Sequence, residues 1–171
     1  MKINICVLSI FFLVFGCNRM PIEEKFEEIK NTDYSDLSGI SIGMRDRQCV
    51  VVRYDDIVFM MRHRYDKPSE IRSLLTTFDD SIIIMPFSDR KRFEKALNVF
   101  GDLSVTNMII DENANVYIKL YWNDQCIYDF IRVQSGHSLD DVKERFHLDE
   151  DYVLYEDNWY VHKECKECKG R

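Results

Sequence analysis

Two cysteines near the end of the chain have the spacing of a redox pair or of half a metal site. Cys165 and Cys168 form a C-x-x-C motif, and His162 lies three residues before it. Such a thiol pair can be oxidised reversibly, or it can supply two zinc ligands with His162 as a third. The motif falls in a charged tail, residues 163–171, with no predicted helix after it to lower the thiol pKa. A solvated tail and a local disulfide are the alternatives, and no cofactor is predicted.

A short basic cluster is the second candidate site. Arg62, His63, Arg64 and Tyr65 follow a strand-like segment and concentrate positive charge in a chain with a formal net charge of −7. One interpretation is contact with an anion or carboxylate of a partner. The other is a solvated loop whose arginines pair with nearby aspartates.

The other polar residues form no catalytic arrangement along the sequence. His137 and His147 lack ligand spacing, and the six glycines do not gather into a phosphate-binding loop. Residues 135–137, Ser-Gly-His, lack the strand–G-x-S-x-G–helix context of a hydrolase nucleophile. The sequence therefore favours a protein that is not an enzyme.

Two more cysteines lie inside strand-like segments. Cys49 and Cys126 each follow a glutamine and precede an apolar residue. A buried free thiol behaves as a small apolar side chain, and this is the interpretation that we favour for both. In an oxidising compartment, these two with Cys165 and Cys168 could instead form two disulfides in three connectivities.

Cys17 follows a segment that is typical of export. Lys2 precedes an apolar run that ends in Val14-Phe15-Gly16-Cys17, with a small residue directly before the cysteine. The run is shorter than the about 20 residues that span a bilayer and suits a signal peptide. This pattern resembles a bacterial lipoprotein signal. The resemblance implies cleavage before Cys17 and attachment of diacylglycerol to its thiol.

The lipoprotein resemblance implies a location and a division of the chain. The protein is expected in the cell envelope of a Gram-negative bacterium, as an outer-membrane lipoprotein on the periplasmic side or the cell surface. The expected parts are the removed signal (residues 1–16), a lipidated tether with a helix and loop (17–45), one globular domain (46–164) and a charged tail (165–171). The acidic balance argues against binding to nucleic acid and against electrostatic binding to anionic lipid.

Hydrophobic periodicity predicts the elements that must position these residues. Apolar side chains recur at helical spacing in residues 21–31, 66–78, 89–100 and 139–146. Ser138 and Asp141 form a capping box for the last of these helices. Residues 31–43 are expected to form a loop. Strands are predicted at residues 48–54, 57–62, 81–87, 105–111, 116–122, 125–133, 151–155 and 159–162.

From residue 57 the predicted order is strand, helix, strand, helix, strand, strand, helix. Together with residues 108–116, Met-Ile-Ile-Asp-Glu-Asn-Ala-Asn-Val, this order resembles thioredoxin-like lipoproteins. The resemblance implies an α/β or α+β fold with helices flanking a mixed sheet, one parallel strand pair, and an extra C-terminal hairpin. The family's catalytic cysteines have no counterpart at residues 63–69, and its cis-proline has none at 104–106. The resemblance therefore implies a redox-inactive version.

Three functional hypotheses follow. The leading one is a non-catalytic lipoprotein, anchored to the membrane through Cys17, whose domain binds a protein or peptide. The second is an immunity-type protein that neutralises a basic toxin at the envelope, since opposite charge speeds capture. The third is a thiol oxidoreductase that works through Cys165 and Cys168.

Overall fold

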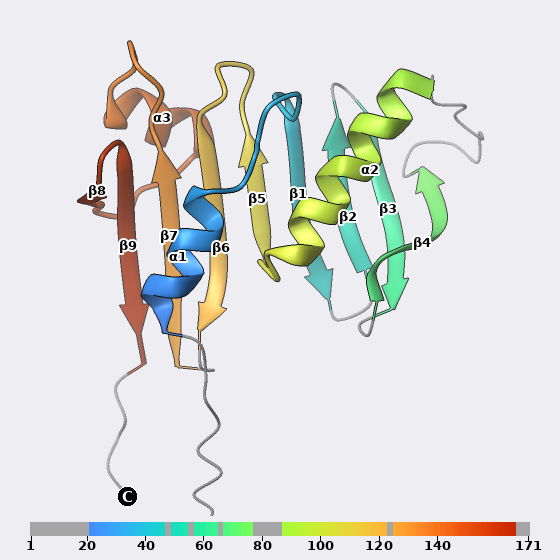
Figure 1. Ribbon diagram of the computed structural model, residues 1–171, viewed down its shortest axis with the longest axis horizontal. Coiled ribbons are helices and arrows are strands. Elements are labelled where there is room, and N and C mark those ends of the chain that lie inside the picture. Colours follow the sequence, from blue (N-terminus) through green and yellow to red (C-terminus); the bar gives the residue numbers. More distant parts are fainter. Residues whose placement is uncertain are drawn as a thin grey trace, which may run out of the picture.

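A single antiparallel sheet dominates the computed structural model of the chain (Figure 1). The structure describes residues 21–46, 49–54, 57–64, 67–76, 87–122 and 125–166. The helices of these residues are α1 (Ile22–Lys30), α2 (Phe87–Asp102) and α3 (Leu139–Phe146). The strands are β1 (Ile40–Asp46), β2 (Cys49–Tyr54), β3 (Ile57–Arg64), β4 (Lys67–Thr76), β5 (Asn107–Ile110), β6 (Val116–Trp122), β7 (Cys126–Arg132), β8 (Val153–Glu156) and β9 (Trp159–Cys165).

The strands lie in the order β4-β3-β2-β1-β5-β6-β7-β9-β8, and every neighbouring pair is antiparallel. The chain builds this sheet from two similar runs. In the first, α1 precedes the meander β1 to β4; in the second, α2 precedes β5, β6 and β7, and α3 and β8 are inserted before β9. The first strands of the two runs, β1 and β5, pair at the centre of the sheet.

Each helix that opens a run covers strands of the other run. Figure 1 shows α1 over β6 and β7, and α2 over β1 to β3. The Phe26 ring of α1 accordingly packs against the Phe130 ring of β7 in a tilted arrangement, with ring centroids 5.2 Å apart. This exchange puts α1, α2 and both halves of the sheet into one hydrophobic core. Each fully buried large apolar side chain contributes about 1.5–3 kcal/mol to such a core.

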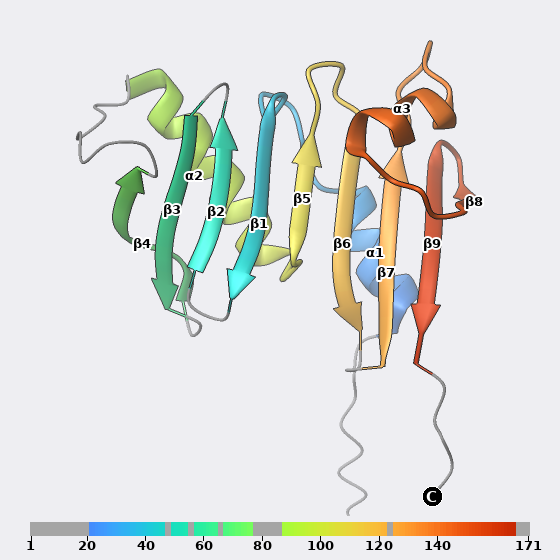
Figure 2. The same cartoon turned by 180° about the vertical axis from the view of Figure 1, so that it is seen from behind.

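The opposite face of the sheet has a smaller core under α3, as the view from behind shows (Figure 2). Val142 and Phe146 of α3 pack against Tyr117, Ile131 and Val133. Because successive strand residues point to opposite faces, β6 and β7 contribute side chains to both cores. The described helices include none that is long and apolar enough to cross a bilayer.

Several predicted elements are confirmed. The helix at residues 139–146 has the predicted bounds, and both halves of the Ser138–Asp141 capping box are formed. β6 has the predicted bounds as well. α1 and the β8–β9 hairpin lie within one or two residues of their predicted starts. These segments carry strong local signals, such as caps, turns and regular apolar spacing.

The helix predicted at residues 66–78 is wrong, because this segment forms β4. Ile71, Leu74 and Leu75 have helical spacing, but the β3–β4 ladder pairs Met61 with Leu74 and His63 with Ile71. Three steps along β4 thus match two steps along β3, so β4 has one extra residue here, which is a β-bulge. A bulge breaks the two-residue alternation of a strand, so the apolar spacing imitates a helix.

The loop predicted at residues 31–43 ends early, because β1 begins at Ile40. Ile40 and Ile42 are fully buried and alternate with Ser41 and Gly43, the pattern of a strand with one covered face. The serine and glycines of this segment obscured that alternation. β1 lies at the centre of the sheet and belongs to the same core as the later strands.

The fold contains both helices and a sheet, as expected, and it ends in the expected hairpin. The described strand pairs include no parallel pair, so the predicted mixed sheet is wrong and the thioredoxin-like order is not confirmed. The strand predicted at 81–87 lies outside the described residues up to 86, and Phe87 begins α2. A sheet of sequential antiparallel strands with helices packed on it is an α+β arrangement.

Candidate functional site

Three consecutive apolar side chains are exposed on the edge strand β8. Val153 is 65% exposed, Leu154 62% and Tyr155 42%, and we call these three residues the edge patch. In the part of the chain that the structure describes, one other large apolar side chain, Tyr121, is exposed to this degree. Consecutive exposed apolar residues at a sheet edge are a common feature of interaction surfaces.

The α1–β9 region holds the edge patch in place. The Tyr155 ring packs edge-on against Phe26 of α1 with centroids 4.6 Å apart, and Trp159 packs against the same ring at 5.8 Å. Lys30 forms ion pairs with Glu156 and Asp157 in the β8–β9 turn. β8 is therefore held by its ladder with β9, by the Tyr155 side chain and by one ion-pair network, while Val153 and Leu154 stay exposed.

Acidic side chains lie on the segment before β8, in the turn after it and on α1 near Tyr155, and we call them the acidic rim. Asp149, Glu150 and Asp151 are exposed and directly precede β8 along the chain. On the α1 side, burial raises the pKa of Tyr155, and the nearby charges of Glu23 and Glu27 raise it further. The rim consists of Glu23, Glu27, Asp149, Glu150, Asp151 and Asp157, all exposed. An apolar centre within a polar rim is the usual arrangement of a protein–protein interface.

β8 also has features that oppose pairing with a second copy of the chain. It is four residues long, its ladder with β9 is irregular between Leu154 and Glu156, and acidic residues precede it. Short length, bulges and charges protect sheet edges against self-association. Two acidic rims would repel each other, whereas a basic partner would be attracted.

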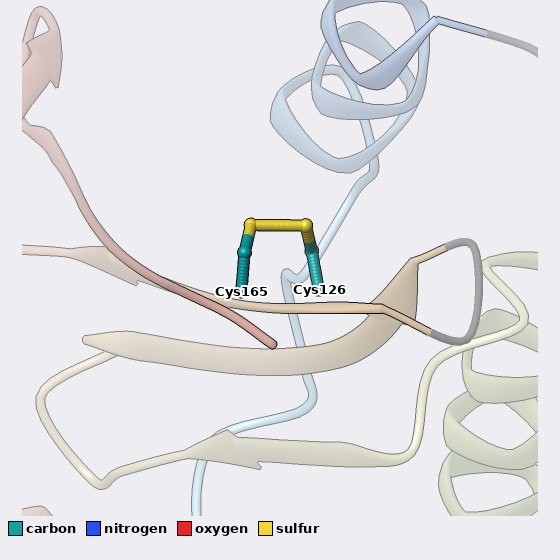
Figure 3. The surroundings of a disulfide bond; sticks show 2 residues. All are labelled: Cys126 and Cys165. Atoms are coloured by element: carbon teal, nitrogen blue, oxygen red, sulfur yellow. A yellow bond between two sulfur atoms is a disulfide. The ribbon is translucent and has the colours of Figure 1, made fainter. Parts of the chain in front are cut away.

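A disulfide joins β7 and β9 (Figure 3). Cys126 and Cys165 are directly paired in the antiparallel ladder, and their sulfur atoms are bonded. The interpretation of Cys126 as a free thiol is therefore wrong. The reason is spatial: β9 pairs with β7 although 39 residues separate the two cysteines. With its sulfur bonded to Cys126, Cys165 provides neither a thiolate ligand nor half of a pair with Cys168.

The structure describes only some of the remaining predicted site residues. Arg62, His63 and Arg64 form the end of β3, whereas Tyr65 lies outside the described residues. Cys17 and Cys168 also lie outside them. His162 is on β9, where its Nδ1 lies 2.9 Å from the backbone oxygen of Asp151. No group of histidine, cysteine and acidic side chains within the described residues could hold a metal.

A buried carboxylate is the polar feature that the sequence did not reveal. Asp129 of β7 is 2% exposed, and its Oδ2 lies 3.3 Å from Lys119 Nζ on β6. Its Oδ1 receives no hydrogen bond from the described residues. Burial raises the pKa of Asp129, and Lys119 opposes that shift. The groups that face it on neighbouring elements are Tyr117, Lys119, Glu150, Tyr152 and His162.

Asp129 is better explained by structure than by catalysis. Lys119, Asp129 and His162 occupy one cross-strand row of β6, β7 and β9. Burial raises the pKa of Tyr117, and the Asp129 charge raises it further, so this tyrosine stays protonated. The row contains no serine, threonine or cysteine that a neighbouring base could activate. The edge patch is therefore the stronger candidate site.

The signal for the edge patch was present in the sequence. Val153-Leu154-Tyr155 is an apolar run between two acidic groups, Asp149-Glu150-Asp151 and Glu156-Asp157. The missing information was the place of this strand at the edge of the sheet, which follows from β9 lying between β7 and β8. Comparisons with protein-family models, with curated proteins and with solved structures give no match for this chain.

Proposed function

We propose that this protein is a membrane-anchored lipoprotein whose domain binds another protein through the edge patch. The observation that carries the binding proposal is the exposure of Val153, Leu154 and Tyr155 on an edge strand that has acidic side chains near it. The anchor rests on the lipoprotein-like segment that ends at Cys17.

The surface suggests the chemistry of the partner. An added strand would use the outer backbone groups of β8 for hydrogen bonds, with Val153 and Leu154 contacting alternate side chains. The acidic rim favours lysine or arginine next to those apolar residues, because opposite charges guide association and exclude wrong partners. Because Val153 and Leu154 are consecutive and point to opposite faces of the sheet, the partner is an extended basic segment with apolar residues on both of its faces.

Site-specific photo-crosslinking tests this proposal. A photoreactive phenylalanine analogue replaces Leu154 in the full-length protein in its native membrane, and the same analogue at Glu112 is the matched control. Glu112 is exposed in the β5–β6 turn. We expect a discrete adduct from position 154 that is absent from position 112. Equal adducts from both positions would refute the edge patch as the binding surface.

A charge introduced into the edge patch then tests the interface with the identified partner. Leu154→Lys places a cation in the apolar centre, and we expect affinity to fall at least tenfold, which is about 1.4 kcal/mol. Glu112→Lys changes the net charge further in the same direction at a distant position, and we expect little change. Unchanged affinity of the Leu154→Lys variant would contradict the proposal.

The acidic rim also favours the immunity-type hypothesis, in which the partner is a basic toxin. Electrostatic attraction raises the association rate, which matters for a protein that must capture a toxin quickly. In that case expression of the lipoprotein protects toxin-challenged cells, and the Leu154→Lys variant loses this protection. Wild-type protein that gives no protection would exclude this version while leaving other partners open.

A further inference from the structure

One end of the sheet combines the start of α1 with the two aromatic residues that end β6. We call it the tethered end, defined by Ile22, Tyr121, Trp122, Cys126 and Cys165. Trp122 pairs with Cys126 and Cys126 with Cys165, so the last residues of β6 and β9 and the first of β7 lie side by side. Figures 1 and 2 both show α1 beginning at this end of the sheet.

The aromatic residues of the tethered end have the properties of membrane-interface residues. Tyr121 is 62% exposed, and Trp122 is partly buried against the main core. Tyrosine and tryptophan favour the bilayer interface because each has an apolar ring and a polar group. Lys163 and Lys166 are exposed near this end, together with Glu164 of β9 and with Glu23 and Glu24 at the start of α1.

The proposed lipid anchor would bring this end to the membrane. Three residues separate Cys17 from Pro21, and the four Cα–Cα steps between them span at most about 14 Å. We infer that the tethered end docks on the bilayer surface, with Tyr121 and Trp122 in the interfacial region. This inference rests on the proposed lipidation of Cys17.

Docking in this orientation would leave the edge patch accessible. In both views β8 lies at the side of the sheet, in the half away from the start of α1 (Figures 1 and 2). A partner could therefore reach β8 without competing with lipid. A domain that docks on the bilayer would present β8 at a fixed height above the surface, whereas a freely rotating domain would not.

Trp122 supplies its own probe, because the chain contains two tryptophans and the other, Trp159, is buried. Full-length lipidated protein is reconstituted into phosphatidylcholine vesicles that carry bromine near the glycerol end of the acyl chains. We expect at least twofold quenching in the Trp159→Phe variant, which retains Trp122. The Trp122→Phe variant is the matched control and should be quenched far less.

The outcomes separate the anchor from the docking. Mass spectrometry first establishes whether diacylglycerol is attached to Cys17; its absence would refute both the anchor and this inference. Lipid-attached protein whose Trp122 is not quenched would refute the docking alone. If Trp159→Phe unfolds the chain, the difference in quenching between wild type and Trp122→Phe gives the same answer, since it isolates Trp122.

Discussion

At the residue scale, the buried carboxylate of Asp129 connects burial to pH. It is almost fully buried beside Lys119, and burial raises its pKa above the ordinary value of an aspartic acid. A folded-state pKa above the unfolded one means that the folded protein binds the proton more tightly. The contribution of this group to stability is therefore fully present below the unfolded pKa and is lost as pH rises through the folded pKa.

Asp129→Asn should remove this pH dependence. We expect the free energy of unfolding of the variant, relative to wild type, to increase as pH rises from 3.8 towards neutrality. The reason is that the buried carboxyl of the wild type must ionise over this range, whereas an amide does not ionise. Urea unfolding at a series of pH values measures this difference. A difference that does not change with pH, or that falls, would contradict the structure around Asp129.

Asp33→Asn is the control with the opposite sign. Hydrogen bonds with Ser35 and Lys95 lower the pKa of the exposed Asp33 carboxyl. Its contribution is present above the unfolded pKa and is lost as pH falls. The variant should therefore be less stable than wild type at neutral pH and approach it in acid, the reverse of Asp129→Asn.

The disulfide is the second residue-scale prediction. Cys126→Ser should destabilise the protein by about 4 kcal/mol, because the bond closes a loop across 39 residues of sequence separation and removes that loop-closure entropy from the unfolded chain. Denaturant unfolding measures the loss. Cys49→Ser is the control, since Cys49 forms no disulfide with the described residues. Equal stability of both variants would contradict the Cys126–Cys165 pairing.

At the element scale, local signals predicted what local forces determine. The capping box of α3 and the turn after β8 are contained within a few residues, and both are confirmed. β4 was mistaken for a helix because a bulge alters its apolar spacing, and the bulge depends on pairing with β3. The Cys126–Cys165 bond and the edge position of β8 depend on β9 joining β7, which no short segment encodes.

Ser138→Ala tests the element for which sequence and structure agree best. The Ser138 hydroxyl accepts a hydrogen bond from the Asp141 backbone amide at 3.2 Å, and the Asp141 carboxylate accepts one from the Ser138 amide. Losing an N-cap of this kind should cost about 1 kcal/mol. Chemical denaturation measures it. The same change at the exposed Ser135, in the preceding turn, should have little effect, and equal effects would argue against the cap.

At the scale of the whole molecule, the proposed membrane-docking end and the proposed partner-binding edge belong to one sheet. Two runs of elements interlock through exchanged helices, so α1, α2 and strands from both halves of the sheet share one core. Net charge alone predicted an acidic protein that avoids anionic surfaces. The fold adds that acidic side chains lie near the edge patch, and that the tethered end carries Tyr121 and Trp122 together with Glu23 and Glu24 at the start of α1.

Cys17→Ser should release the protein from the membrane, because a hydroxyl at this position cannot form the thioether to diacylglycerol. Metabolic labelling with a radioactive fatty acid and detergent phase partitioning measure the change. Cys49→Ser, the matched control, should keep both the label and the membrane fraction. A Cys17→Ser variant that is still labelled would refute the proposed anchor.

The most direct test of the central claim is hydrogen exchange of the full-length lipoprotein, with and without the partner that is crosslinked at position 154. Strand addition at the outer edge of β8 predicts slower exchange of its backbone amides, Val153–Glu156, when the partner binds. Amides in the β5–β6 turn around Glu112 should not change. Slower exchange elsewhere on the domain, with exchange in β8 unchanged, would contradict binding of the partner at β8.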